Sequence, residues 1–584
     1  MLRLLLLGVV AAAVAVAGEG GVQVTLSGGV FKGETLEAGG ERKVFSFRGI
    51  PFAKPPVGAL RFKDPVPSEP WEGVKESVAP PQCPQFDFEG LIGGGEMKVV
   101  GEEDCLYLHV YTPQLCGDEP LPVMVFLHGG GFFMGDPDLA GGSPLPLLTK
   151  DVVLVAPQYR LGTLGFLYTG DDVIPGNMGL KDQTLALRWV QENIRSFGGD
   201  PERVTIYGES AGGASVHFQM LTPKAEGLFH RAIMHSGTAL NPWAVRLDDP
   251  KRVAAGVGRQ LECAGVEVDG QLDSVALLNC LQNVPASDLV TTSQQGETWN
   301  NFPLHMVPRV DGDYLPDHPA NLVREGRYNK VDVISGVCRD EGAYIGMGAL
   351  TTPVGEQLLS EFERFAAYSV GTDQDEEPYL LARRIFFHYL GAGNLTLTQS
   401  NIDRWIEMFG DVFFNMPHDL ASQFHARDAD YGHGVYMYQL DHRGQNSFTE
   451  QAIRTNMTID FKWVGHGDDL QYLSNSVFSV PPLERTDDLF LSEVMLRLWT
   501  TFAATGNPTP DLSLGFRWTP VTPTNLQYLS LTPTAKMRPD PRTENRAFYT
   551  DLPTRVNKLL FPEKFAAPSV APRGGADARG HCHA

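Results

Sequence analysis

The chain has 584 residues, of which 42% are hydrophobic and 20% are charged, and its formal net charge at pH 7 is −23. This composition is sufficient for a large folded core and argues against intrinsic disorder. A chain this acidic, with no run of Lys and Arg to offset the charge, is not expected to bind nucleic acid or an anionic membrane surface. Length alone leaves the number of domains open.

The first 17 residues, MLRLLLLGVVAAAVAVA, combine one early arginine, an apolar run and a small-residue ending. This pattern is typical of a secretory signal peptide, and the apolar run is short for a membrane anchor. The polar, Gly-rich C-terminal end carries neither a GPI-type hydrophobic tail nor a KDEL-type ending. We therefore predict a signal peptide over residues 1–17, a secreted protein without a stable membrane anchor, and a disordered tail over residues 563–584.

Short apolar runs and helical periodicity alternate along the chain. The apolar runs predict five buried strands, at Val123–Leu127, Val152–Ala156, Val204–Tyr207, Val331–Ile334 and Val435–Leu440. The periodicity predicts helices over Leu180–Ile194, Ala211–Leu221 and Leu491–Ala504. Strands that alternate with helices predict an α/β fold, in which helices cover both faces of a mostly parallel sheet.

The stretch VTIYGESAGGAS surrounds Ser210 with small residues at the point where a predicted strand gives way to a predicted helix. A G-x-S-x-G pattern alone is weak, because about 0.3 matches would arise by chance at this composition. The strand–turn–helix setting is that of a nucleophile elbow, whose tight turn would require Gly208 and Gly212. The helix N-terminus would also favour a developing oxyanion. The alternative, a small-residue helix start packed on a strand, explains only the glycines.

A second Gly-rich stretch, VMVFLHGGGFFMG, ends the predicted strand Val123–Leu127. Three consecutive glycines allow backbone N–H groups to turn toward a ligand, which predicts an oxyanion-binding loop rather than a flexible surface loop. A serine hydroxyl becomes a good nucleophile only when a base takes its proton. In this type of fold the acid and then the histidine follow the serine along the chain.

Seven cysteines fit an oxidising, extracellular compartment, and their odd number leaves at least one without a partner in the chain. Asn394 and Asn456 begin N-x-T sequons, which predict glycosylation if the sites are used.

Several stretches resemble, in order, the type-B carboxylesterases, the family that includes the cholinesterases. The two signature-like stretches are EDCLYLHVYTP (103–113) and FGGDPERVTIYGESAGG (197–213). Others are FRGIPFAKPPVGALRF (47–62), YRLGTLGFL (159–167), GNMGLKDQTLALRWVQENI (176–194) and RAIMHSG (231–237). The resemblance covers roughly residues 22–562 and implies one α/β-hydrolase domain over residues 18–562.

The resemblance also implies a catalytic triad. The acid would be Glu341 in SGVCRDEG, because the family motif places it directly before a glycine, with Asp340 as the close competitor. The base would be His466, which stands between two glycines in WVGHGDDLQYL. Three other histidines lie too close to the serine in sequence to be the downstream base: His128, His217 and His235.

The roles implied by this resemblance are those of a serine esterase. His466 would take the proton as Ser210 attacks an ester carbonyl, and Glu341 would orient the imidazole. The oxyanion would be held by N–H groups, those of Gly130, Gly131 and Ala211. A small-molecule ester is the expected substrate, and the reaction needs no metal and no cofactor.

The same resemblance implies structural features. These are disulfides Cys83–Cys105 and Cys263–Cys280, ion pairs Arg61–Glu103 and Arg160–Asp182, and a hydrogen bond from Ser236 to the acid. Cys116, Cys338 and Cys582 remain, and Cys582 in the predicted tail suggests a homodimer as a hypothesis. Cys338 is expected to be buried and inert.

The chain departs from parts of the family pattern. The first disulfide loop contains no Trp, so cation–π binding of choline is not expected. Juvenile hormone esterases typically carry Gln before the nucleophile and G-x-x-H-T at the base, where this chain has Glu209 and Gly467. A lipase, a sterol esterase or a juvenile-hormone-type esterase with the same triad remains an alternative. A non-catalytic adhesion protein is disfavoured, because such relatives usually lack the nucleophile and carry a transmembrane segment.

Overall fold

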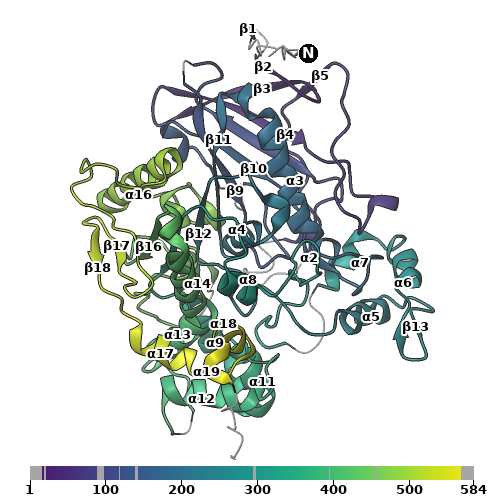
Figure 1. Ribbon diagram of the computed structural model, residues 1–584, viewed down its shortest axis with the longest axis vertical. Helices are drawn as coiled ribbons and strands as arrows, with labels where there is room; N and C mark the ends of the chain where they lie inside the picture. Colours follow the sequence, from purple (N-terminus) through teal and green to yellow (C-terminus); the bar gives the residue numbers. More distant parts are fainter. Residues whose placement is uncertain are drawn as a thin grey trace, which may run out of the picture.

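The computed structural model describes residues 16–18, 21–87, 98–117, 119–138, 142–293, 298–393, 395–453 and 457–566. Within them, a 14-stranded sheet forms the centre of the molecule (Figure 1). Its strands, in order across the sheet, are β1 (Val16–Gly18), β2 (Gly21–Leu26), β3 (Gly29–Ala38), β4 (Arg42–Pro51), β8 (Tyr107–Thr112), β10 (Val153–Pro157), β9 (Leu121–Leu127), β11 (Gly199–Glu209), β12 (Arg231–His235), β15 (Asp332–Cys338), β16 (Val435–Leu440), β17 (Tyr528–Leu531) and β18 (Lys536–Arg538); β5 (Val74–Glu76) pairs with β3.

The sheet is parallel at its centre and antiparallel at its edges. All neighbouring strands from β10 to β17 are parallel. The strands β1, β2, β3, β4 and β8 add to β10 in antiparallel order, β5 pairs parallel with β3, and β18 adds antiparallel to β17. The five predicted apolar runs correspond to β9, β10, β11, β15 and β16, with Val152 and Val331 directly preceding their strands, which confirms the α/β fold class.

Helices cover both faces of the sheet, because side chains alternate between the faces along each strand. In β9, Val125 belongs to the same buried cluster as Val216 of α4 (Ala211–Leu221), which also includes residues of α3 (Met178–Asn193). The next residue, Phe126, belongs to the cluster that contains Trp499 of α16 (Thr486–Thr505). The predicted helices therefore correspond to α3 and α4 on one face and α16 on the other.

A helical layer between residues 240 and 430 packs around a third buried cluster. The helices of this layer are α5 (Pro250–Gln260), α6 (Ser274–Leu281), α7 (Ala286–Thr291), α8 (Pro319–Glu325), α9 (Ala343–Thr351), α10 (Pro353–Ser360), α11 (Phe362–Ser369), α12 (Pro378–Leu390), α13 (Ile402–Gly410) and α14 (Met416–Arg427). Shorter helices elsewhere in the chain are α2 (Gly162–Phe166), α15 (Phe448–Ala452), α17 (Thr543–Thr550), α18 (Arg555–Leu560) and α19 (Pro562–Phe565). A π-helical turn, Asp411–Asn415, joins α13 to α14. Such turns are rare and occur often at functional sites.

Two disulfides connect the pairs implied by the sequence resemblance, Cys83–Cys105 and Cys263–Cys280. Among the remaining described cysteines, Cys116 is free and exposed, and Cys338 is free and buried. Cys582 and the sequon residues Asn394 and Asn456 lie outside the described residues, so the homodimer and the glycosylation stay predictions.

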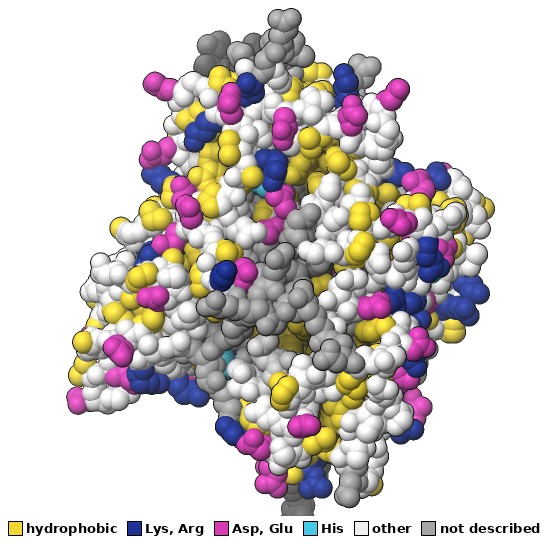
Figure 2. All heavy atoms as spheres, turned by 180° about the vertical axis from the view of Figure 1, so that it is seen from behind, with side chains coloured by type: hydrophobic (Ala, Val, Ile, Leu, Met, Phe, Trp, Pro, Cys, Tyr) yellow, Lys and Arg dark blue, Asp and Glu magenta, His cyan; other side chains and the backbone are white. Residues whose placement is uncertain are grey.

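The predicted signal peptide and tail lie almost entirely outside the described residues. Val16–Gly18 pairs with β2 as a short antiparallel strand. In the part of the chain that the structure describes, no helix has the length and apolar character that a bilayer crossing requires. On the face shown in Figure 2, acidic and basic side chains are interspersed rather than gathered by sign.

Both predicted ion pairs form, and both are bidentate. Arg61 contacts Glu103 at 2.7 and 2.5 Å. Arg160 contacts Asp182 at 2.8 and 2.7 Å, with Asp182 fully buried at the start of the helix that covers the sheet. Burial raises the pKa of Asp182 even though Arg160 lies beside it.

Replacing Arg160 with Met should lower the free energy of unfolding by about 3–5 kcal/mol, because it leaves a buried charge without its partner. The change is measured as the shift in urea midpoint of the purified protein. Lys54→Met is the matched control, because the Lys54–Glu69 pair is exposed and its loss should leave the midpoint nearly unchanged. A midpoint shift of Arg160→Met no larger than that of the control would contradict a structural role for the buried pair.

Candidate active site

Ser210 occupies a sharp turn between β11 and α4, with φ of 58° and ψ of −121°. Positive φ is uncommon and strained for a residue with a side chain, and such strain persists where the surroundings enforce it. Here the surroundings are very close: a Cβ on Gly208 would lie 2.4 Å from the Leu127 carbonyl oxygen, and one on Gly212 would lie 2.0 Å from the same atom. The glycines are therefore required by backbone packing of the turn against β9.

Glu341 follows β15 in a turn and is 1% exposed. One carboxylate oxygen accepts hydrogen bonds from the Ser236 hydroxyl at 2.5 Å and from the Cys338 N–H at 2.7 Å. The other oxygen lies 2.7 Å from Nδ1 of His466. The structure therefore brings together the predicted acid, the predicted base and the serine expected to contact the acid.

Asp340, the competing acid, points elsewhere. Its carboxylate accepts the Val464 N–H at 2.8 Å and pairs with Arg339. Of the two neighbouring acidic residues, Glu341 is thus the one that contacts His466.

His466 uses Nδ1 for Glu341, which leaves Nε2 outside that contact, and His466 and Ser210 line the same cavity. A second carboxylate, that of the buried Glu209, lies 3.1 Å from Nε2 without the orientation of a hydrogen bond. Burial raises the pKa of Glu209 to about 8. Burial lowers the pKa of His466, but Glu209 and then Glu341 outweigh it and raise that pKa to about 9.

The glycine turn that follows β9 lines the same cavity. Gly130 and Gly131 both have positive φ, 103° and 60°, and both line the cavity. A Cβ on Gly130 would lie 2.3 Å from the Met134 carbonyl oxygen, so the turn cannot accept a larger residue there. Ala211 is the first residue of α4, where an N–H group has no acceptor within the helix. These N–H groups are available for a negatively charged oxygen near Ser210.

The cavity has a volume of about 180 Å³ and a mainly apolar lining. The glycine turn and the helical layer supply its aromatic and aliphatic walls: Phe133, Met134, Trp243, Phe302, Leu304, Tyr344, Ile345, Phe414 and Phe448. The ring of Phe414, from the π-helical turn, has its centroid 4.4 Å from that of His466. Sequence reasoning missed these residues, because apolar residues of a cavity wall and of a core follow the same pattern.

The three histidines set aside in the sequence lie away from this cavity. His128 stacks on Tyr159, His217 lies 3.0 Å from His425, and His235 lies 2.8 Å from Asp469, in each case with both partners buried.

One cluster among the described residues has the composition of a metal site, His442 with Asp487 and Asp488. It does not line the cavity that holds Ser210, and both carboxylates are already close to Arg485.

Comparisons with known proteins agree with this architecture. Residues 21–549 match the family described as the carboxylesterase family. The chain is 36% identical to the juvenile hormone esterase of Tribolium castaneum, over 81% of this chain and 82% of that protein. It is 34% identical to pyrethroid hydrolase Ces2a of Mus musculus, over 88% of each chain. It is 32% identical to venom carboxylesterase-6 of Apis mellifera, over 91% of this chain and 94% of that protein. With the family match spanning most of its length, this chain belongs to the carboxylesterase family.

Proposed function

We propose that the protein is a secreted serine carboxylesterase that uses Ser210, His466 and Glu341 as a catalytic triad. The observation that carries this proposal is the 2.7 Å contact between His466 Nδ1 and Glu341, in a cavity that the strained Ser210 also lines. The family match supports ester hydrolysis as the reaction class. The predicted signal peptide and the two disulfides support export to an oxidising compartment.

The proposed mechanism assigns one step to each group. His466 Nε2 accepts the proton of Ser210 as the hydroxyl attacks the ester carbonyl, and Glu341 stabilises the imidazolium through Nδ1. The N–H groups of Gly130, Gly131 and Ala211 receive the oxyanion, each contributing about 3–4 kcal/mol by analogy with other serine hydrolases. His466 then protonates the leaving alcohol. Water, deprotonated by the same base, releases the acid from the acyl-enzyme.

The apolar lining favours esters whose acyl and alcohol groups are uncharged. A cationic alcohol group would need Glu209 as the partner of its positive charge. The Glu209 carboxylate already lies 3.1 Å from His466 Nε2. The chain is similar to a juvenile hormone esterase and to a pyrethroid hydrolase, so a substrate panel should include a juvenile hormone and a pyrethroid. Rates on butyrate and long-chain p-nitrophenyl esters would separate an esterase from a lipase-type preference.

A covalent-labelling experiment tests the proposal. The secreted protein is treated with an organophosphate, and the adduct is located by mass spectrometry while p-nitrophenyl butyrate hydrolysis is followed. We expect one adduct per chain, on the peptide that contains Ser210, and loss of hydrolysis in proportion to labelling. Hydrolysis that persists in fully labelled protein, or an adduct on another residue, would refute the proposed nucleophile.

Replacing Glu209 with Gln should shift the acidic limb of the kcat/KM–pH profile to lower pH by about one unit. His466 must be unprotonated to accept the proton, so activity rises with pH as His466 loses its proton. Glu209 raises the pKa of His466, so removing its charge lets the base become available at lower pH. Glu209→Asp, which retains a carboxylate, is the control. Superimposable limbs for wild type and Glu209→Gln would contradict the electrostatic coupling.

A further inference from the structure

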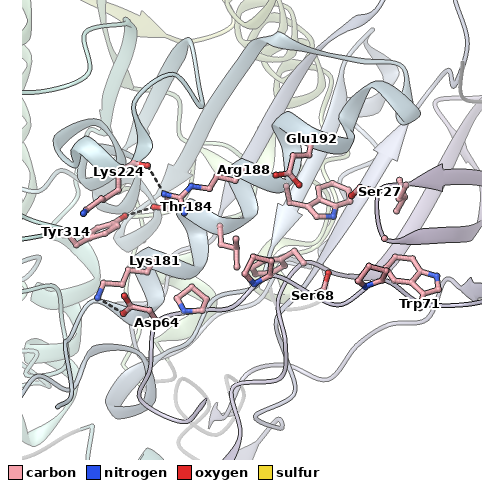
Figure 3. A pocket seen from close by; sticks show the side chains of 18 of the residues that line it. Ser27, Asp64, Ser68, Trp71, Lys181, Thr184, Arg188, Glu192, Lys224 and Tyr314 are labelled. Carbon is pink, nitrogen blue, oxygen red and sulfur yellow. Dashed lines mark hydrogen bonds and ion pairs between the residues drawn. The ribbon is translucent and has the colours of Figure 1, made fainter. Parts of the chain in front are cut away.

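A second cavity, with a volume of about 410 Å³, runs along the outer face of α3 (Figure 3). It shares no lining residue with the cavity that holds Ser210. Its volume falls within the range of about 300–1,000 Å³ that is typical of small-molecule sites. We call it the α3 groove; α3 forms one wall and residues 64–71 form the other.

Helix α3 presents one stripe of side chains to the groove. The lining residues Lys181, Thr184, Arg188 and Glu192 recur at spacings of three and four, which places them on one face of the helix. From Lys181 to Glu192 this stripe is about 16 Å long, at about 1.5 Å per residue. The groove can therefore hold an extended molecule rather than a single ion.

One end of the groove carries three cations and two carboxylates. Lys181 pairs with Asp64 at 2.6 Å, and Lys224 pairs with Asp313 at 2.6 Å. Arg188 reaches toward Lys224 (Figure 3) and donates to the Lys224 carbonyl oxygen, at 3.3 Å. Among the residues that the structure describes, Arg188 pairs with no carboxylate. Carboxylates of the groove neutralise both lysines, so of these three cations Arg188 is the one left for a ligand.

The other end is mainly apolar, and Glu192 lies at its edge (Figure 3). Trp71 and Trp189 line it, together with Leu26, Phe52 and Pro70. The Trp71 indole N–H donates to the Val30 carbonyl oxygen at 3.1 Å. A Cβ on Gly28 would lie 2.6 Å from the Trp71 ring, so the ring rests directly on the backbone of the β2–β3 turn. An aromatic wall fixed in this way binds an apolar chain without an ordering cost.

We propose that the α3 groove binds an anionic amphiphile, a medium-chain carboxylate, whose head pairs with Arg188 and whose chain lies on Trp189 and Trp71. The unpaired cation selects an anion, and its bidentate geometry suits a carboxylate. The aromatic end selects an apolar body. A cationic ligand would not pair with Arg188, and a ligand charged along its whole length would not match the aromatic end. The site is separate from the proposed esterase reaction and does not depend on it.

Calorimetric titration of the full chain with decanoate and with decanol, at low ionic strength, tests the proposal. Arg188→Ala should weaken decanoate binding about fivefold and leave decanol binding unchanged, because the lost interaction is a charge-assisted hydrogen bond at an exposed position. Arg195→Ala is the matched control, an exposed arginine seven residues farther along, in the 3-10 turn after α3, that does not line the groove. Trp71→Ser should weaken both ligands. Butyrate, too short to reach the aromatic end, should bind far more weakly than decanoate.

Two further variants distinguish binding in the α3 groove from binding in the Ser210 cavity. Gly28→Ala, which forces the Trp71 ring off the turn, should reproduce the effect of Trp71→Ser. Phe414→Ala alters the Ser210 cavity and should leave binding to the α3 groove unchanged. Decanoate affinity that is the same in wild type, Arg188→Ala and Trp71→Ser would overturn the proposal. Affinity that falls only in Phe414→Ala would overturn it as well, by locating the ligand in the Ser210 cavity.

Discussion

Replacing Ser210 with alanine should lower kcat/KM for p-nitrophenyl butyrate by about 10⁶-fold, comparable to the loss of a triad nucleophile in other serine hydrolases. The hydroxyl is held at the elbow by backbone contacts that do not involve its side chain, with the Ser210 N–H donating to the His235 carbonyl oxygen at 2.9 Å. The turn, the oxyanion donors and the His466–Glu341 contact should therefore survive the substitution. Substrate binding should change little, so the loss should fall on kcat.

Ser215→Ala is the matched control for this prediction. Ser215 lies farther along the same helix, is fully buried, and accepts a hydrogen bond from Gln183 at 3.0 Å outside the Ser210 cavity. Its removal should cost some stability and leave kcat within a few-fold of wild type. Circular dichroism establishes that both variants are folded. Turnover by Ser210→Ala at the level of Ser215→Ala would refute the nucleophilic role of Ser210.

The central part of the fold was predictable from the sequence, and its edges were not. The runs that became β9, β10, β11, β15 and β16 are covered on both faces, so nearly every residue in them is apolar. In β2, by contrast, buried and exposed or half-buried residues alternate. Such a strand contains few consecutive apolar residues, and its antiparallel pairing is decided by partners that the chain supplies later.

The predicted site residues were found partly by local pattern and partly by family resemblance. The glycines around Ser210 are a local signal, because each is required by a nearby carbonyl oxygen. The contact of Glu341 with His466 spans 125 residues and has no local signal, so only the family motif indicated it.

The contact of Glu209 with His466 went unpredicted for the same reason, although Glu209 was noted beside Ser210. Its effect depends on burial, which raises the pKa of Glu209, and burial of one polar residue is not visible in a sequence. The α3 groove is a similar case. Trp71 and Arg188 are 117 positions apart in the sequence, and the fold brings them to one cavity.

Replacing Glu341 with glutamine should lower kcat by about 10⁴-fold while leaving the fold and KM nearly unchanged. The amide oxygen can still accept from the Ser236 hydroxyl and the Cys338 N–H, so the side chain should keep its place. The amide nitrogen then faces His466 Nδ1 and donates to it. The proton of a neutral imidazole must consequently move to Nε2, the nitrogen that has to accept the Ser210 proton. A near-isosteric change thus disables the base by selecting the wrong tautomer.

Asp340→Asn separates this effect from a general loss of negative charge near the site. Asp340 is adjacent in sequence but bonds to Val464 and Arg339, so its replacement should leave kcat within a few-fold of wild type. The two variants should also differ in their NMR spectra, because only Glu341→Gln changes which ring nitrogen of His466 carries the proton. If Glu341→Gln retained most of its activity while Asp340→Asn lost it, the acid of the triad would have to be reassigned to Asp340. An equal and small effect of both would mean that His466 is oriented by Glu209 instead.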